Sequence, residues 1–267
     1  IIQEVFKQIQ RRLTCGTIHA FPLMNPIGFE TGSRNITMSR EDLNRSFPGE
    51  ANGSLGERIA HRIFTTIMET SPTLVLDLHT DWKQSIPYTV IDRNPGHPHK
   101  TAYDQTQLFA KQVGFVTIVE TEHVRNSFSS NLIVNGVPAL TLELGEPYVI
   151  NEKNVEFGLS AIWNILACLE MIAPLKTSFR YPVSEAYASG LPLRYSDKPF
   201  SSKSGIIRFL AEPGDEILKD QPIAKIVNAF GKHQETVHAL EQAIVLGHSD
   251  SSVVFPGMPI MAFGLHA

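Results

Sequence analysis

Short apolar segments alternate with helical patterns through the first 172 residues, and this alternation limits the possible folds more than any other feature. We expect strands at 17–22, 73–79, 115–120 and 137–144, and helices at 1–13, 54–70, 101–113 and 151–172. Such alternation predicts an α/β fold, in which helices cover a mixed sheet. The helix at 54–70 begins with a capping box, in which Ser54 and Glu57 satisfy exposed backbone donors.

The sequence changes in character after Pro174. From residue 181 onward it holds only short β-like segments, separated by turn signals such as Pro213-Gly214-Asp215, and these segments lie at 205–210, Pro222–Val227 and 243–246. We therefore predict two domains, an α/β domain over residues 1–174 and a smaller all-β domain over residues 175–267.

Composition narrows the classes of partner. The 267 residues include 23 basic and 27 acidic side chains, for a formal charge of −4. The sequence has no basic run of the kind that binds nucleic acid. No segment approaches the roughly 20 apolar residues of a membrane span. Cys15 and Cys168 form neither a metal-type pair nor a disulfide framework, which fits a cytoplasmic protein. A small-molecule or peptide-like partner is expected, and the oligomeric state stays open.

The expected strand at 73–79 ends in a polar pair. In the sequence LVLDLHT, residues 74–80, Asp77 and His79 should share one face because side chains alternate along a strand. Ligands of open α/β sheets bind at the carboxyl ends of strands, where these residues lie. A histidine in such a position is more often a hydrogen-bonded structural residue than a metal ligand, and both interpretations stay open at this point.

A polar loop precedes the capped helix. The sequence GSRNITMSREDLNRSFPG, residues 32–49, carries Arg34, Arg40, Asn44 and Arg45. A guanidinium group matches a carboxylate in bidentate fashion, and a neighbouring asparagine can add a donor. We expect Arg40 to be a solvated arginine paired with Asp42 or Glu41, and Arg45 to be available for a ligand.

A single acidic residue lies within the apolar strand at 137–144. Glu143 comes just before Gly145 and Pro147, which end the strand. Burial would raise the pKa of this carboxylate and suit it to move protons near neutral pH. The alternative is a carboxylate that a neighbouring arginine or backbone amide satisfies.

Four stretches in this order resemble the succinylglutamate desuccinylase and aspartoacylase family, which has a zinc carboxypeptidase-like fold: NPIGFETGSRN (25–35), DLNRSFPG (42–49), LDLHT (76–80) and VPALTLELG (137–145). The resemblance covers nearly the whole chain. It implies a zinc-dependent hydrolase that cleaves the amide bond of an N-acyl amino acid, with a carboxypeptidase-type metallopeptidase as the alternative. By the same resemblance, His79 is a zinc ligand, Glu143 is the general base, Arg34 polarises the scissile carbonyl, and Asn44 with Arg45 binds a substrate carboxylate.

The chain departs from the family pattern at the metal site. The family takes two more zinc ligands from an H-x-x-E motif that lies before the first helix, and this sequence starts inside that helix. None of the other histidines considered supplies the two missing zinc ligands; these are His19, His97, His99 and His123. We expect that a preceding segment of about 20 residues supplies the motif, and the alternative is a metal-free relative.

A second departure concerns specificity. Asp81 and Trp82 follow the histidine motif, where family members commonly carry small residues, so we expect the indole to reshape the pocket. Ser129 and Ile133 stand where aspartoacylase has the tyrosine and arginine that read an aspartate side chain. N-acetylaspartate is therefore a poor candidate for the substrate.

A different class of function is also conceivable. The sequence GIIRFLAEPGDEILKDQPIAKIV, residues 205–227, resembles biotinyl and lipoyl carrier domains, which carry a modified lysine at a hairpin tip. Lys232 lies near a turn but lacks the flanking residues usual for modification, which favours a structural role. A serine hydrolase is disfavoured because the sequence has no G-x-S-x-G elbow.

Overall fold

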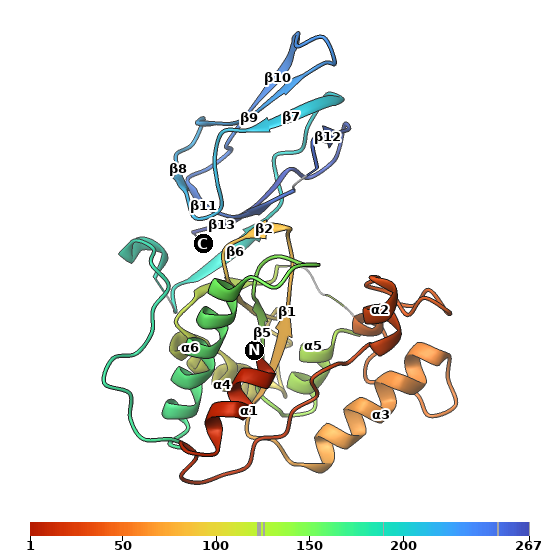
Figure 1. Cartoon of the computed structure of the whole chain (residues 1–267), viewed down its shortest axis with the longest axis vertical. Coiled ribbons are helices and arrows are strands. Elements are labelled where there is room, and N and C mark those ends of the chain that lie inside the picture. The colour runs from red at the N-terminus through yellow and green to blue at the C-terminus, as the bar shows by residue number, and fades with distance from the viewer. Residues whose placement is uncertain (122–123, 125, 189, 250, 267) are drawn as a thin grey trace.

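The computed structural model describes residues 1–121, 124, 126–188, 190–249 and 251–266. A layer of helices and strands forms the larger part of the molecule, and a β-rich lobe extends from one end of it (Figure 1). Within the described ranges, no helix has both the length and the apolar character needed to cross a membrane.

Nine strands of the described residues form one mixed sheet. The order is β1 (Val75–His79), β5 (Ala139–Glu143), β3 (Tyr88–Ile91), β4 (Val116–Val119), β6 (Pro192–Ser196), β13 (Met261–Leu265), β11 (Ala243–His248) and β2 (Gln84–Ser85), and β8 (Glu216–Ile217) also pairs with β11. The β1–β5, β3–β4 and β4–β6 pairs are parallel, whereas the β3–β5 pair and the pairs of β11 and β13 are antiparallel.

A separate antiparallel sheet lies in the β-rich lobe. Its order is β10 (His233–His238), β9 (Pro222–Val227), β7 (Gly205–Phe209) and β12 (Val253–Val254). Buried side chains of both sheets meet in one core, among them Ile223, Ile226, Val245 and Met261. The predicted fold class, a mixed sheet with helices and a β-rich C-terminal part, is confirmed. The boundary at residues 174 and 175 stays a prediction, and β6, β11 and β13 continue the sheet of the earlier residues.

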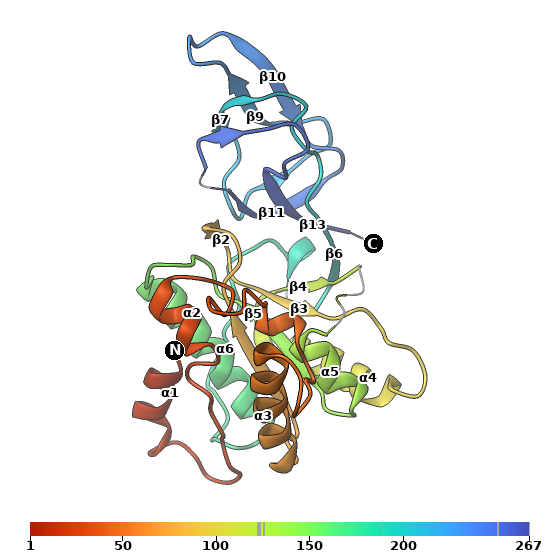
Figure 2. The ribbon, with the colours of Figure 1, turned by 90° about the vertical axis from the view of Figure 1, so that its right-hand side faces the viewer.

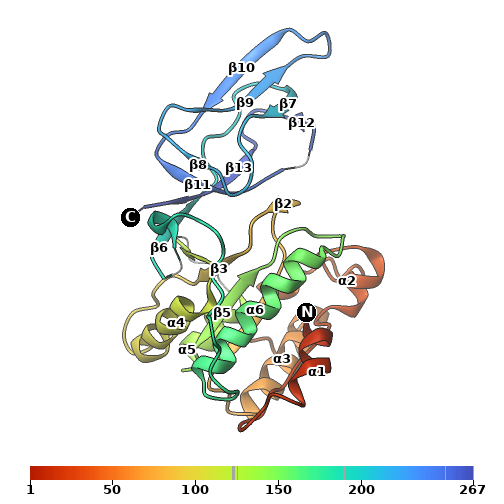
Figure 3. The same cartoon turned by 60° about the vertical axis from the view of Figure 1, so that its left-hand side comes forward.

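The helices of the described chain are α1 (Ile2–Ile9), α2 (Pro26–Thr31), α3 (Leu55–Glu69), α4 (Lys100–Val113), α5 (Phe128–Val134) and α6 (Glu152–Cys168). α1 lies beside α6 (Figure 2), and the two helices share an apolar cluster with Leu76 and Leu78 of β1. α4 and α5 contact β5 (Figure 3). Because Leu76 and Leu78 face the α1–α6 cluster, the alternating residues Asp77 and His79 face the other way.

The capping box of α3 forms as predicted. The Ser54 hydroxyl accepts a hydrogen bond from the Glu57 backbone N–H at 3.3 Å, and the Ser54 N–H donates to Glu57 Oε2 at 2.8 Å. These bonds fix the start of α3, and the polar loop at 32–49 ends shortly before it.

Two groups of elements differ from the sequence expectation. The strand predicted at 17–22 does not form, because a strand needs a second strand to pair with its backbone, and none of the described residues pairs with this segment. Conversely, β3, α2 and α5 form without having been predicted. Tertiary pairing decides both outcomes, since β3 is short and is held between β5 and β4.

Candidate active site

The register of three strands brings the key polar residues together. His79 on β1 is the parallel partner of Glu143 on β5, and Tyr88 on β3 is the antiparallel partner of the same glutamate. The carboxyl ends of β1 and β5 therefore meet at one edge of the sheet, where ligands of α/β proteins usually bind. Sheet topology thus joins residues that are far apart in the sequence.

Asp77 and His79 face the same way, as predicted. His79 Nε2 lies 2.8 Å from Asp77 Oδ2, and the two side chains are 25% and 12% exposed. This bond fixes the orientation of the imidazole and leaves Nδ1 for another partner. Burial opposes a charge on the ring, but the Asp77 carboxylate outweighs burial and raises the pKa of His79 to about 9.

Glu143 has the properties of a buried acid–base group. Its Oε2 atom is buried and has no hydrogen-bond partner among the described residues. Burial raises the pKa of Glu143 to about 7, with a contribution from the Asp81 and Asp77 carboxylates that His79 and Arg34 oppose. The alternative was that a neighbouring arginine or backbone amide satisfies this carboxylate, and for Oε2 no described residue does so. A carboxylate with this pKa can accept and return a proton near neutral pH.

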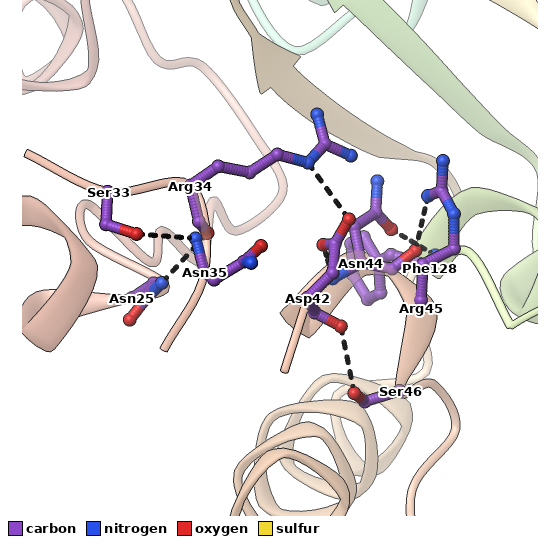
Figure 4. A network of polar contacts seen from close by, with 9 residues as sticks. All are labelled: Asn25, Ser33, Arg34, Asn35, Asp42, Asn44, Arg45, Ser46 and Phe128. Carbon is purple, nitrogen blue, oxygen red and sulfur yellow. Dashed lines mark hydrogen bonds and ion pairs between the residues drawn. The ribbon is translucent and has the colours of Figure 1, made fainter. Parts of the chain in front are cut away.

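Asp42 organises the polar loop at 32–49. Its Oδ1 accepts a hydrogen bond from the Asn44 N–H at 2.9 Å and so caps the short 3-10 helix Leu43–Arg45. Its Oδ2 lies 2.9 Å from Nε of Arg34. In Figure 4 the dashed line to Asp42 starts at Nε, and neither terminal nitrogen of Arg34 is joined to Asp42. The ion pair therefore orients Arg34 through one nitrogen and leaves the guanidinium fork for another partner.

The expected pairing of Arg40 differs from the structure. Arg40 is exposed, and Asp42 pairs with Arg34 instead. Glu41 accepts a hydrogen bond from the Gly56 N–H at 2.9 Å and another from the Ser54 hydroxyl at the start of α3. Both carboxylates are thus used to hold the loop and the helix in place.

Asn44 and Arg45 meet the start of α5. Asn44 Oδ1 accepts a hydrogen bond from the Phe128 N–H at 2.7 Å, so its side-chain NH2 group is left to donate (Figure 4). Arg45 is exposed, and one of its terminal nitrogens donates to the Asn44 carbonyl at 2.7 Å. Buried Leu43 and Phe47 anchor the backbone on both sides.

The structure brings only part of the predicted site into direct interaction. The charge of Arg34 lowers the pKa of both His79 and Glu143. Asn44 and Arg45 instead contact α5. The site therefore has a central part at the sheet edge and a second part at the loop.

The described residues do not complete a metal site. No three histidine, cysteine, aspartate or glutamate side chains in the described part of the chain are grouped so that they could hold a metal ion. His79 fits one ligand position, because Asp77 holds one ring nitrogen and the other is left over. His19, His97 and His99 join no such group, and His123 lies outside the described residues.

Sequence analysis missed Tyr88 and the contact it makes. The Tyr88 hydroxyl donates a hydrogen bond to Oδ2 of Asp81, which lies two residues beyond His79. The run Tyr88-Thr89-Val90-Ile91, rich in β-branched and aromatic residues, was the available signal for this strand.

Trp82 packs toward the β-rich lobe. It joins an apolar cluster with Tyr88, Ile86 and Leu246, and a Cβ added at Gly247 would lie 2.9 Å from Trp82 Cβ. The expectation that the indole reshapes the pocket stays a prediction, and the packing ties the segment after β1 to β11.

Three further residues from the sequence analysis lie away from the strand ends. Ser129 and Ile133 are buried on α5. Lys232 is exposed in the turn between β9 and β10, where its N–H donates to Asn228 Oδ1 at 2.9 Å. The structural role favoured for Lys232 stays a prediction.

Comparisons with known proteins support the family resemblance of the four motifs. The family model of the succinylglutamate desuccinylase/aspartoacylase catalytic domain matches residues 1–169. The N-alpha-acetyl-L-2,4-diaminobutyric acid deacetylase of Halomonas elongata is 34% identical over 79 residues. That match covers 30% of this chain and only 23% of the length of the relative.

Solved structures show the same fold over almost the whole chain. An aspartoacylase family protein from Mesorhizobium loti matches with a TM-score of 0.80 at 18% identity, over 99% of this chain and 79% of that chain. A succinylglutamate desuccinylase from a Silicibacter species matches with a TM-score of 0.77 at 16% identity, with the same two coverages of 99% and 79%. Since the family model covers residues 1–169 of 267, the chain belongs to the succinylglutamate desuccinylase/aspartoacylase family.

Proposed function

We propose that the protein is a zinc-dependent amidohydrolase that cleaves the amide bond of an N-acyl amino acid. The observation that carries this proposal is Glu143, a buried carboxylate with an unpartnered oxygen, placed beside His79 by the parallel register of β1 and β5. Membership of the family supports the reaction class, and the Halomonas relative is named for the deacetylation of an acetylated amino acid.

Glu143 acts as the general base. It takes a proton from the attacking water and passes it to the nitrogen of the leaving amine, so that one carboxylate serves both steps. A pKa of about 7 suits both transfers, because the group is then neither too weak a base nor too weak an acid near neutral pH.

His79 would hold the metal through Nδ1, since Asp77 binds Nε2. When bound, zinc would supply a Lewis acid that activates water and polarises the scissile carbonyl. A catalytic zinc takes three protein ligands, and His79 would be one of them.

Arginine and asparagine donors would position the substrate. The charge of Arg34 acts on His79 and Glu143, and its guanidinium group would stabilise the negative charge that develops on the carbonyl oxygen. Asn44 and Arg45 present an amide and a guanidinium donor at the start of α5, which suits a substrate carboxylate. Binding at two points holds the amide in line for attack.

The test uses the full-length protein, supplied with zinc, and a panel of N-acyl amino acids and short peptides. We expect about one zinc per chain, hydrolysis of the N-acyl amino acids, and loss of both properties in His79→Ala. His233→Ala, at an exposed position on β10, serves as the control.

Two results would count against the proposal. Zinc-loaded protein that hydrolyses no member of the panel would overturn the amidohydrolase assignment, and normal metal content in His79→Ala would remove His79 from the metal site. Hydrolysis of peptides alone, at the residue with the free carboxylate, would favour a carboxypeptidase instead.

A further inference from the structure

A cavity of about 100 Å³ opens on the surface of the β-rich lobe, beside the exposed side chain of Leu240. Its floor consists of buried apolar side chains of the lobe core, which are Ile217, Ala239, Ala243, Phe263 and Leu265. Sites for small molecules are typically concave and apolar, with a few polar groups that orient the ligand. The cavity has this character, and the proposed reaction does not use it.

Strand register builds the cavity. Leu265 on β13 is the antiparallel partner of Arg194 on β6 and of Ala243 on β11. Ala243 is in turn the partner of Ile217 on β8. Because paired residues share one face of a sheet, these side chains form a row across four strands. A ligand that lies along the row would meet a cation at one end and apolar side chains at the other.

The charged side chains at the rim of the cavity are unbalanced. Among the described residues that line it, Arg194 and Lys198 are basic and Glu241 is acidic. Nη2 of Arg194 lies 3.2 and 3.4 Å from the two carboxylate oxygens of Glu241. This exposed pair is weak, and it leaves Nε and Nη1 of the arginine without a partner among the described residues. The rim therefore carries excess positive charge and donors that an anion can use.

The cavity is separate from the candidate active site. Tyr195 lies between Arg194 and Ser196 on β6, so its side chain faces the opposite side of the sheet. There it joins the apolar cluster of Trp82, whereas the floor of the cavity belongs to the core of the β-rich lobe. β13 and α2, the helix before the arginine loop, also lie far apart in both Figure 1 and Figure 2.

We propose that this cavity binds a short-chain monocarboxylate, with butyrate as the representative ligand. The carboxylate accepts hydrogen bonds from Arg194 and Lys198, and the alkyl chain lies against Phe263 and Leu265. An apolar cavity of about 150 Å³ holds benzene, so the smaller volume here suits a chain of about three or four carbons. The proposal does not depend on the reaction at the candidate active site.

The experiment is an NMR titration of the full-length protein, labelled at isoleucine and leucine methyl groups, with butyrate. We expect the methyl signals of Ile217 and Leu265 to shift, with a Kd on the order of 1 mM for a ligand of this size. Butyramide has the same shape without the charge, and it should bind roughly 10-fold more weakly. From acetate to propionate to butyrate, the affinity should rise by about 4-fold for each methylene that leaves water.

Substitutions at the rim test the anion contact. Arg194→Gln should weaken butyrate binding by roughly 10-fold, because it removes a charged donor and keeps most of the side-chain length. Lys198→Gln should weaken binding by a smaller factor, since the lysine is exposed and flexible. Arg208→Gln is the matched control, because it removes a positive charge from an exposed position on β7 that does not line the cavity.

Several results would overturn the proposal. These are unshifted Ile217 and Leu265 signals at butyrate concentrations up to about 100 mM, equal affinity for butyramide, and an unchanged Kd in Arg194→Gln. Binding that Arg45→Ala abolishes and Arg194→Gln preserves would place butyrate at the candidate active site instead, which also overturns it. Should Arg194→Gln fail to fold, Lys198→Gln and the comparison with butyramide decide the question.

Discussion

The two parts of the candidate site are held by different means. Sheet register places His79 and Glu143, and their polar atoms are largely removed from water. The loop at 32–49 instead relies on side-chain bonds to Asp42, and its Arg34 and Arg45 are exposed. Burial shifts the pKa of Glu143 toward neutral pH, which suits a group that transfers protons. The exposed arginines keep their water shell and can exchange this water for a ligand.

The two parts of the site also affect the stability of the fold differently. An unpartnered buried carboxylate oxygen destabilises the fold, and the surrounding strand compensates, because Leu140 and Leu142 beside Glu143 are completely buried. The exposed arginines do not destabilise the fold in this way, and the ion pair between Arg34 and Asp42 contributes little to the free energy of unfolding. The comparison therefore predicts that substitution in the buried part affects kcat, whereas substitution in the exposed part affects KM.

The largest expected effect is on catalysis at the buried part. Glu143→Gln should lower kcat by about 10²–10⁴-fold, because the amide keeps the shape of the side chain but cannot accept the proton. Metal content and substrate binding should persist, and the melting temperature should match or exceed that of the wild-type protein. The measurement is kcat on a confirmed substrate together with metal analysis and thermal unfolding, and near-normal kcat would exclude Glu143 as the base.

The next effect concerns recognition at the exposed part. Arg45→Ala should raise KM by roughly 10- to 100-fold with little change in melting temperature, because the exposed side chain donates only to a neighbouring carbonyl. Arg45→Lys should restore only part of the affinity, since it keeps the charge without the planar fork. Arg208→Ala, at an exposed position on β7, is the control. A variant that unfolds would show that Arg45 is structural.

The smallest effect is on the pH dependence of stability. The pKa of Glu143 is about 7 in the folded protein and 4.5 ordinarily, so between these values the folded state binds the proton more tightly. The free energy of unfolding of the wild-type protein should therefore fall as pH rises from about 4.5 to about 7. Glu143→Gln should lack this part of the decline.

Denaturant unfolding of the metal-free protein at several pH values checks this prediction. His79 contributes a separate decline, because its raised pKa makes its contribution complete below pH 6.5 and lost as pH rises toward about 9. Glu143→Gln should therefore reduce the pH dependence of the free energy of unfolding between about pH 4.5 and 7, and His79→Ala should reduce it between pH 6.5 and about 9. Parallel curves for wild-type protein and Glu143→Gln below pH 7 would contradict the burial argument.

Sequence patterns predicted the elements that carry strong local signals. The helix α3 was predictable from its capping box, and β1 and β5 were predictable from apolar runs that end in polar residues. The segment at 17–22 has a similar apolar pattern and yet forms no strand, because pairing partners are a property of the whole fold. β3 is the converse case, a four-residue strand with a weak pattern that both neighbours stabilise.

For the site, the sequence by itself determined which residues are candidates: His79 and Asp77 through strand alternation, Glu143 as an acid in an apolar strand, and the arginine loop through its composition. Tertiary structure alone decided that His79 and Glu143 are register partners, that Asp42 holds Arg34, and that Tyr88 holds Asp81. The physical reason is that alternation and burial patterns are local properties of the sequence. The pKa of Glu143 and the partners of each charge instead depend on side chains that come together only when distant strands and loops pair.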